Sequence, residues 1–100
     1  MSVKKIEEKD FKEVINNKEK KVLVDCYADW CGPCKMLAPE LEKVQSNLSV
    51  VKVNVDEFED IARQYGVMSI PTLILFENGK PVKQTVGFMD KKKIETFIGK

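Results

Sequence analysis

Histidine is absent from this 100-residue sequence, and cysteine occurs at only three positions, Cys26, Cys31 and Cys34. A structural zinc site usually takes four cysteine or histidine ligands, and an iron–sulfur cluster is usually held by four cysteine thiolates. The chain cannot supply either set alone, so a metal centre would need ligands from a second copy. This scarcity of ligands favours cysteine chemistry without a metal.

The sequence also lacks a charge imbalance and a long apolar run. It carries 17 Lys+Arg against 16 Asp+Glu, a formal net charge of +1, so no global field attracts nucleic acid or an acidic membrane. No segment is long enough to span a bilayer, and residues 1–8 contain no signal-peptide core. We therefore expect a cytoplasmic protein, and the length suits one domain over residues 1–100.

What the sequence does contain is a pair of cysteines separated by two residues, Cys31-Gly32-Pro33-Cys34. Proline fits the first turn of a helix, which predicts a loop that carries Cys31 and a helix that carries Cys34 one turn in. The free N–H groups and the dipole at the helix start should stabilise a Cys31 thiolate. Cys34, inside the helix, suits the resolution of a mixed disulfide. A static structural disulfide is the alternative, but the cytoplasm keeps thiols reduced.

A nearly continuous apolar run, 22–28, comes before this motif and predicts a central strand covered on both faces. Asp25 interrupts the run, and a buried carboxylate is costly unless it is paired or protonated. Because side chains alternate along a strand, Asp25 and Cys26 must point to opposite faces. We expect Asp25 to lie under the helix as a proton carrier for Cys34, with Lys52 as its candidate partner. The alternatives are an Asp25 satisfied by backbone donors and a Lys52 that extends to solvent near a sheet edge.

Apolar residues at helical spacing predict four helices, with these buried positions: Phe11, Val14 and Ile15; Leu37, Leu41, Val44 and Leu48; Ile61, Ala62 and Tyr65; Ile94, Phe97 and Ile98. Asp10 opens a capping-box pattern before the first helix, and Asp90 can cap the last. Pro39 should kink the second helix, and Gly66 fits the end of the third.

Strands are predicted at 22–28, 50–55, 70–76 and 82–86 from runs of apolar and β-branched residues. A helix between the first two implies a right-handed crossover between parallel strands. Asn78-Gly79 is a strong hairpin signal between the last two. The expected architecture is α/β, with three parallel strands, then an antiparallel hairpin, and helices on both faces of the sheet.

The sequence resembles the thioredoxin family along essentially its whole length. The matching pieces are Val24-Asp25, Asp29-Trp30-Cys31-Gly32-Pro33-Cys34-Lys35-Met36, Pro39, Lys52-Val53-Asn54-Val55-Asp56, Ile70-Pro71-Thr72, Asn78-Gly79 and Val86-Gly87. The resemblance implies a thioredoxin fold, with a central mixed sheet of four to five strands. The Gly-Pro dipeptide between the cysteines points to the reducing branch of the family, a protein-disulfide reductase.

The resemblance also implies residue roles. Cys31 would be the nucleophile and Cys34 the resolving thiol, with Asp25 as buried acid/base linked to Lys52. Pro71 would be cis and shape the groove for target proteins. An apolar docking surface would consist of Trp30, Gly32, Pro33, Ile70, Val86 and Gly87. Where many members have phenylalanine this chain has Cys26, which we expect to be a small, inert core residue; a regulatory or dimer-forming thiol is the alternative.

Family members are re-reduced by a flavin- and NADPH-dependent or a ferredoxin-dependent reductase, so the resemblance implies no bound cofactor. The implied partners are thioredoxin reductase and disulfide-containing proteins, with the chain acting as a monomer. Two other functions remain open at this point. One is an oxidant or isomerase of the same fold, and the other is a binding module that uses the docking surface without turnover.

Overall fold

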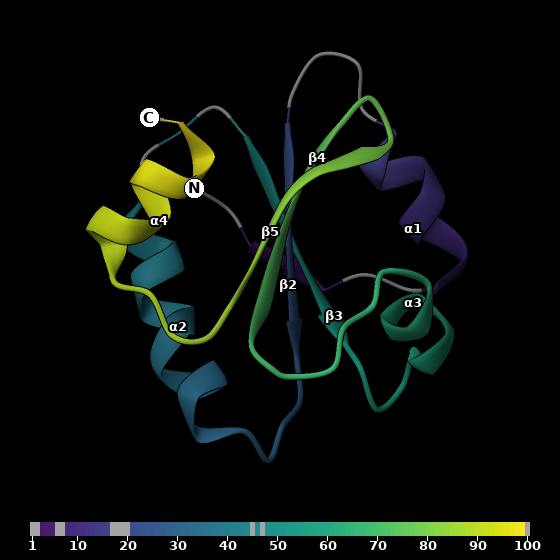
Figure 1. Cartoon of the computed structure of the whole chain (residues 1–100), viewed down its shortest axis with the longest axis horizontal. Coiled ribbons are helices and arrows are strands. Elements are labelled where there is room, and N and C mark those ends of the chain that lie inside the picture. Colours follow the sequence, from purple (N-terminus) through teal and green to yellow (C-terminus); the bar gives the residue numbers. More distant parts are fainter. Residues whose placement is uncertain (1–2, 6–7, 17–20, 45, 47, 100) are drawn as a thin grey trace.

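The computed structural model describes residues 3–5, 8–16, 21–44, 46 and 48–99. Strands and helices follow one another along the chain (Figure 1): β1 Val3–Lys5, α1 Glu8–Ile15, β2 Val22–Tyr27, α2 Gly32–Lys43, β3 Ser49–Asn54, α3 Glu59–Gln64, β4 Thr72–Glu77, β5 Lys80–Val86 and α4 Lys91–Ile98. None of the helices in these described ranges combines the length and apolarity needed to cross a bilayer.

The strands form one mixed sheet in the order β1-β3-β2-β4-β5. β1, β3 and β2 are parallel, whereas β4 runs antiparallel to β2, and β5 antiparallel to β4. The predicted α/β architecture, a mixed sheet with a parallel first part, a C-terminal antiparallel hairpin and helices, is confirmed. The third parallel strand is not the predicted one: the strand from Thr72 runs antiparallel to β2, and β1, which was not predicted, takes the third parallel place. The strand in the middle is β2, whose six residues are all buried, as its apolar run predicts.

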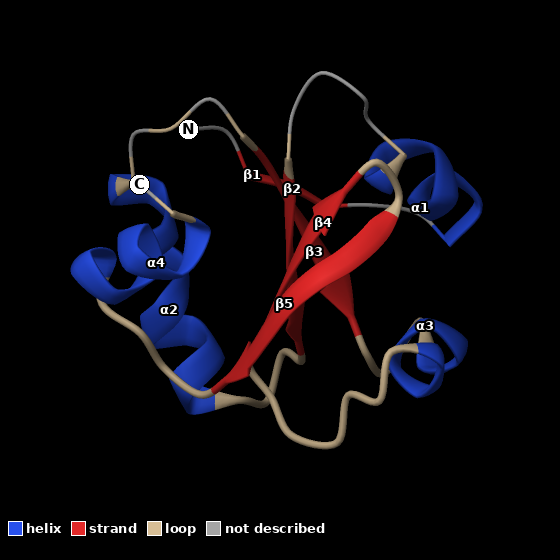
Figure 2. Cartoon of the chain, turned by 45° about the horizontal axis from the view of Figure 1, so that its top comes forward, coloured by secondary structure: helices blue, strands red, loops and turns tan. Residues whose placement is uncertain are grey.

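Helices cover both faces of this sheet (Figure 2). On one face α1 and α3 pack against the sheet through Phe11, Ile15 and Ile61. On the other face α2 and α4 pack through two leucines and two isoleucines, Leu37, Leu41, Ile94 and Ile98. Alternation along β2 sends Val24 and Cys26 to the first core and Leu23 to the second.

Three details differ from the sequence predictions. The first helix begins at Glu8, so Asp10 lies inside it and does not open a capping box. The second ends at Lys43, where the Val44 N–H bonds the Leu41 carbonyl, so Leu48 joins the core from outside the helix. Serine and asparagine are weak helix formers, and three of the five residues from 45 to 49 are of these types. The strand predicted from Ile70 begins at Thr72.

The turns follow the predicted chemistry. Asn78 and Gly79 both have positive φ, 52° and 83°, as the turn of a two-residue hairpin requires. The side chain of Asp90 accepts the Lys93 N–H and caps α4.

The two edges of the sheet are unlike its centre. Among the described residues, β1 contributes three to its edge, Val3–Lys5. The other edge, β5, is mostly exposed and contains Pro81 between Lys80 and Lys83, with a register shift against β4 next to Phe76.

Candidate active site

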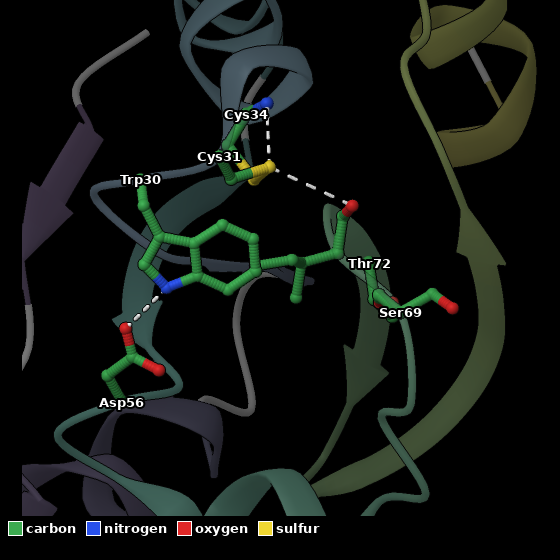
Figure 3. The surroundings of a disulfide bond; sticks show 7 residues. Trp30, Cys31, Cys34, Asp56, Ser69 and Thr72 are labelled. Carbon is green, nitrogen blue, oxygen red and sulfur yellow. Dashed lines mark hydrogen bonds between the residues drawn. A yellow bond between two sulfur atoms is a disulfide. The ribbon is translucent and has the colours of Figure 1, made fainter.

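The site is built where β2 ends and α2 begins. Cys31 is the N-cap residue of α2, and its Sγ accepts a hydrogen bond of 3.2 Å from the Cys34 N–H. Pro33 stands in the first turn, where its missing N–H leaves no backbone bond unmade. Cys31 and Cys34 form a disulfide (Figure 3), so the structure is that of the oxidised protein. The predicted placement of both cysteines is confirmed.

This placement prepares Cys31 for exchange. When the disulfide is reduced, the Cys34 N–H and the positive end of the α2 dipole both favour negative charge on the Cys31 sulfur. A thiolate in this position can attack an external disulfide, and Cys34 lies close enough to displace the product. The arrangement supports reversible thiol–disulfide exchange.

A second loop closes over the disulfide from the start of β4. The Ile70–Pro71 peptide bond is cis, and the carbonyl oxygen of Ile70 lies 3.8 Å from Cys31 Sγ. The Pro71 carbonyl accepts the Gly87 N–H at 2.8 Å, which ties the end of β5 to the same loop. The segments around Cys31, Pro71 and Gly87 thus meet at one site although they are far apart in the sequence.

The side chains around the disulfide present an apolar surface. Trp30 is 70% exposed and Val86 58% exposed. Gly32 and Pro33 are also exposed, and Ile70 is half-buried. Gly87 is half-buried, whereas Pro71 is buried beneath the surface and contributes shape rather than contact area.

A groove beside Cys31, which sequence analysis did not predict, extends this surface. It has a volume of about 380 Å³ and is lined by Trp30, Val55, Val67, Met68, Ser69 and Ile70. Met68 is 96% exposed, and Met36 and Phe88 are the other exposed apolar residues close in sequence to site residues. The only available signal was their proximity in the chain to Cys34, Ile70 and Gly87.

Trp30 is held in place by Asp56, a contact that sequence analysis missed. The indole Nε1 donates a hydrogen bond of 2.8 Å to Asp56 Oδ2 (Figure 3). Asp56 is itself fixed because its N–H bonds the side-chain oxygen of Asn54 at 2.9 Å. The Asn54 amide also reaches Asp29 at 3.5 Å, so this chain of contacts orients the tryptophan next to the disulfide.

Asp25 lies at the centre of β2 and is completely buried. Neither of its carboxylate oxygens has a hydrogen-bond partner among the described residues, which rules out satisfaction by backbone donors within that part of the chain. Burial raises the pKa of Asp25 from 3.8 to about 6, and the positive charge of Lys52 opposes part of this rise. Asp25 can therefore exchange a proton near neutral pH.

Lys52 is paired with Asp25 across the ladder between β2 and β3. It is half-buried, and β3 is an inner strand, so Lys52 does not lie at an edge of the sheet. Its Nζ lies 4.2 Å from the centre of the Tyr27 ring. A pocket of about 230 Å³ brings Tyr27 and Lys52 together with Cys34.

Cys26 belongs to the other face of β2. It is a fully buried free cysteine in the core under α1 and α3. Burial, with a smaller effect of the Asp25 charge, raises the pKa of its thiol to about 12. The prediction of a small core residue is confirmed. Over the described ranges, no cluster of His, Cys, Asp or Glu has the arrangement of a metal site.

Comparison with known proteins matches this geometry to one family. The family model described as Thioredoxin matches residues 2–100. A thioredoxin of Chlamydia caviae is 52% identical over 77% of this chain and 78% of its own, and one of Porphyra purpurea is 39% identical over 100% and 97%. A solved structure of a mutant thioredoxin from Halobacterium salinarum NRC-1 superposes with a TM-score of 0.84 at 37% identity, covering 95% of this chain and 88% of that one.

Thioredoxins exchange electrons through such a disulfide without a bound cofactor, and the family generally works with a thioredoxin reductase and disulfide-containing targets. Fold, cysteine geometry and sequence agree in this case. The chain belongs to the thioredoxin family, as a protein-disulfide oxidoreductase whose redox-active disulfide joins Cys31 and Cys34.

Proposed function

We propose that this protein works in the reducing direction, with Cys31 as the nucleophile and Cys34 as the resolving thiol. The observation that carries the proposal is the position of Cys31 at the N-cap of α2, where its sulfur accepts the Cys34 N–H. Only the sulfur of the N-cap residue receives this backbone donor and adjoins the apolar surface around Trp30. Cys34 lies within the helix and is suited to internal attack.

In the first step a target disulfide docks against the surface formed by Trp30, Gly32, Pro33, Ile70, Val86 and Gly87, which Pro71 shapes from below. The Cys31 thiolate attacks one target sulfur, and the target's S–S bond breaks as the new S–S bond forms. The second target sulfur leaves as a thiolate and takes a proton from solvent. The product is a mixed disulfide between Cys31 and the target.

In the second step Cys34 loses its proton to the Asp25 carboxylate, whose ordinary low pKa has been raised toward neutrality. The Cys34 thiolate attacks Cys31 Sγ, the mixed disulfide breaks, and the target leaves with both cysteines reduced. The two electrons delivered to the target come from the Cys31 and Cys34 thiols, which end as the disulfide. Lys52 stabilises the ionised form of Asp25 before the transfer.

Return to the dithiol requires two electrons from a separate reductase, either NADPH-dependent with a flavin or ferredoxin-dependent. We assign the protein to the cytoplasm, because a disulfide reductant operates where the thiol pool is reducing. Residues 1–100 would act there as one domain and as a monomer.

Cysteine variants test the assignment of roles. Cys34→Ser should accumulate mixed disulfides with target proteins, whereas Cys31→Ser should lose insulin-disulfide reduction altogether. The stability of both variants in urea serves as the folding control. A Cys31→Ser protein that reduces disulfides at the wild-type rate would contradict the assignment, and a double variant that still performs the cellular task would indicate a binding module.

The direction of electron flow is tested by the reduction potential of the Cys31–Cys34 pair, measured in buffers of defined thiol/disulfide ratio. A reducing potential, at or below that of the cytoplasmic glutathione pool, is expected. A markedly oxidising value would instead assign the protein to the oxidants or isomerases of this fold.

The role of Asp25 is tested by stopped-flow measurement of the two steps in Asp25→Asn. Attack by Cys31 should keep most of its rate, and resolution by Cys34 should slow by about 10²-fold, in the range of a lost general base. Equal slowing of both steps would argue against proton transfer between Asp25 and Cys34.

A further inference from the structure

Lys52 and Tyr27 lie next to Asp25 on the face of the sheet that α2 covers. Lys52 is the direct ladder partner of Asp25, and Tyr27 follows Asp25 by two positions on the same strand. Residues two apart on a strand, and residues paired across a parallel ladder, project from one face. The three side chains are therefore neighbours.

The ammonium of Lys52 is bound by the ring of Tyr27. Its Nζ lies 4.2 Å from the ring centre, within the range in which a cation is attracted by the negative face of an aromatic ring. The Asp25 carboxylate has no hydrogen-bond partner among the residues described, so Lys52 contacts the tyrosine rather than its ladder partner. The charge of Lys52 nevertheless still acts on Asp25.

Without the Tyr27 ring, the Lys52 ammonium would be more stable if it extended away from Asp25 toward water. An ammonium is strongly hydrated, and a long lysine side chain readily extends toward water. The pocket of about 230 Å³ that Tyr27, Lys52 and Cys34 line is partly open and leads in that direction. The Tyr27 ring opposes this movement, because binding to its face keeps the ammonium beside the sheet.

We propose that Tyr27 is a positioning residue that holds the Lys52 ammonium close to Asp25 and so keeps the Asp25 carboxylate ionised and able to accept the Cys34 proton. This inference rests on the proposed acid/base role of Asp25. It assigns a function to the aromatic side chain whose ring binds the Lys52 ammonium and that lines a pocket together with Cys34 of α2.

The other groups around Asp25 are few. Cys34 and Lys35 from α2, and Asp29 from the turn before α2, line the pocket beside Tyr27 and Lys52, the neighbours of Asp25. On the opposite side β4 places the apolar Leu73 in register with Asp25. Replacing Tyr27 leaves these groups in the chain but also alters the burial of Asp25, which is the larger cause of its raised pKa, so the position of Lys52 is reported by the part of the titration change that requires Lys52.

The test is the titration of Asp25 in the oxidised full chain, followed by carbon-13 NMR of labelled aspartate carboxyl groups and assigned with Asp25→Asn. Tyr27→Leu should raise the midpoint by roughly half a pH unit, because the ammonium withdraws. Tyr27→Trp should lower the midpoint, since indole binds cations best, and Tyr27→Phe should stay near the wild type because it keeps the ring face.

Lys52→Met supplies the matched control. It should raise the midpoint by itself and remove the differences among the Tyr27 variants. Shifts that persist in the Lys52→Met background, or shifts of one sign for both leucine and tryptophan, would overturn the proposal. If Tyr27→Leu does not fold, Tyr27→Trp and Tyr27→Phe still test the proposal, because a midpoint that does not fall in Tyr27→Trp would contradict it.

This readout does not depend on turnover. Failure of the acid/base role of Asp25 would appear separately, as wild-type resolution kinetics in Asp25→Asn.

Discussion

The two faces of the central sheet are built to different rules. Under α1 and α3 the core contains three packed aromatic rings, Phe11, Tyr65 and Phe76, with centroids 5.3 to 6.1 Å apart, and the buried Thr72 donates its hydroxyl to the Ser69 carbonyl. Under α2 the apolar core formed with Leu37 and Leu41 stops at a buried carboxylate without a hydrogen-bond partner in the described part of the chain. One face is optimised for packing, and the other carries the chemistry.

Adjacent residues of β2 show what separates the faces. Asp25 and Cys26 are both fully buried, and burial raises the pKa of both. For the carboxyl group the rise, to about 6, brings the proton into the neutral range, whereas for the thiol the rise to about 12 removes it from that range. Burial therefore makes the Asp25 carboxyl group able to exchange a proton near neutral pH, whereas it keeps the Cys26 thiol protonated and unreactive.

The packed face should dominate stability. Phe76 is fully buried and makes edge contacts with both other rings, so Phe76→Ala should lower the free energy of unfolding by about 3–5 kcal/mol. Urea unfolding measures the loss, with the half-exposed Phe88→Ala as control, for which we expect a much smaller change. Disulfide exchange by the molecules that remain folded should be unaffected; a slower exchange per folded molecule would mean that the two faces are not independent.

The reactive face should make stability depend on pH. Because the folded protein holds the Asp25 proton up to about pH 6, whereas an aspartate in the unfolded chain loses it near the ordinary pKa of 3.8, the contribution of protonated Asp25 to stability is complete below about pH 4 and disappears as pH rises through 6. The loss is on the order of 3 kcal/mol for the oxidised protein. Unfolding measured between about pH 4 and pH 8 should show this decline in the wild type and not in Asp25→Asn. If the free energy of unfolding changed with pH in the same way in the wild type and in Asp25→Asn, the cost of burying the Asp25 charge would have to be offset by a partner.

Cys26 should give the smallest effect. Cys26→Ala should lower the free energy of unfolding in urea by about 1 kcal/mol, because only a small buried group is lost. Cys26→Ser should lower it by about 1–3 kcal/mol, because the serine hydroxyl would be buried in an apolar core. Both variants should reduce insulin at the wild-type rate.

A thiol-labelling experiment complements these variants. In the oxidised protein a thiol reagent should find no reactive cysteine until denaturant is added, and one afterwards, because Cys26 is the free cysteine and is buried. Rapid labelling of the native protein would show that the packed face opens.

Much of this arrangement could be predicted from the sequence, because local rules and tertiary structure agree there. The apolar run of β2, the cysteines at the start of a helix, the Asn78-Gly79 turn and the Asp90 cap all depend on residues close in sequence. The predicted opposition of Asp25 and Cys26 followed from strand alternation alone, and it is confirmed.

The features that escaped prediction depend on distant partners. β1 consists of three residues, and it is a strand because it pairs with Val50, Val51 and Lys52. The bond from Trp30 to Asp56 joins positions separated by 26 residues. The end of α2 at Lys43 was missed for a local reason, because Leu48 continues the helical spacing although serine and asparagine, which are weak helix formers, follow the helix.

The edges of the sheet limit how other proteins can bind to this one. An incompletely folded protein exposes unpaired strands, which can add to an open sheet edge of another protein. Within the residues that the structure describes, the β1 edge offers three residues, and the β5 edge presents a proline between two lysines and an irregular register. An incoming strand finds no long template for pairing. If a disulfide-containing target exposes an unpaired strand, its contact with this protein should therefore stay at the disulfide and not extend along the sheet.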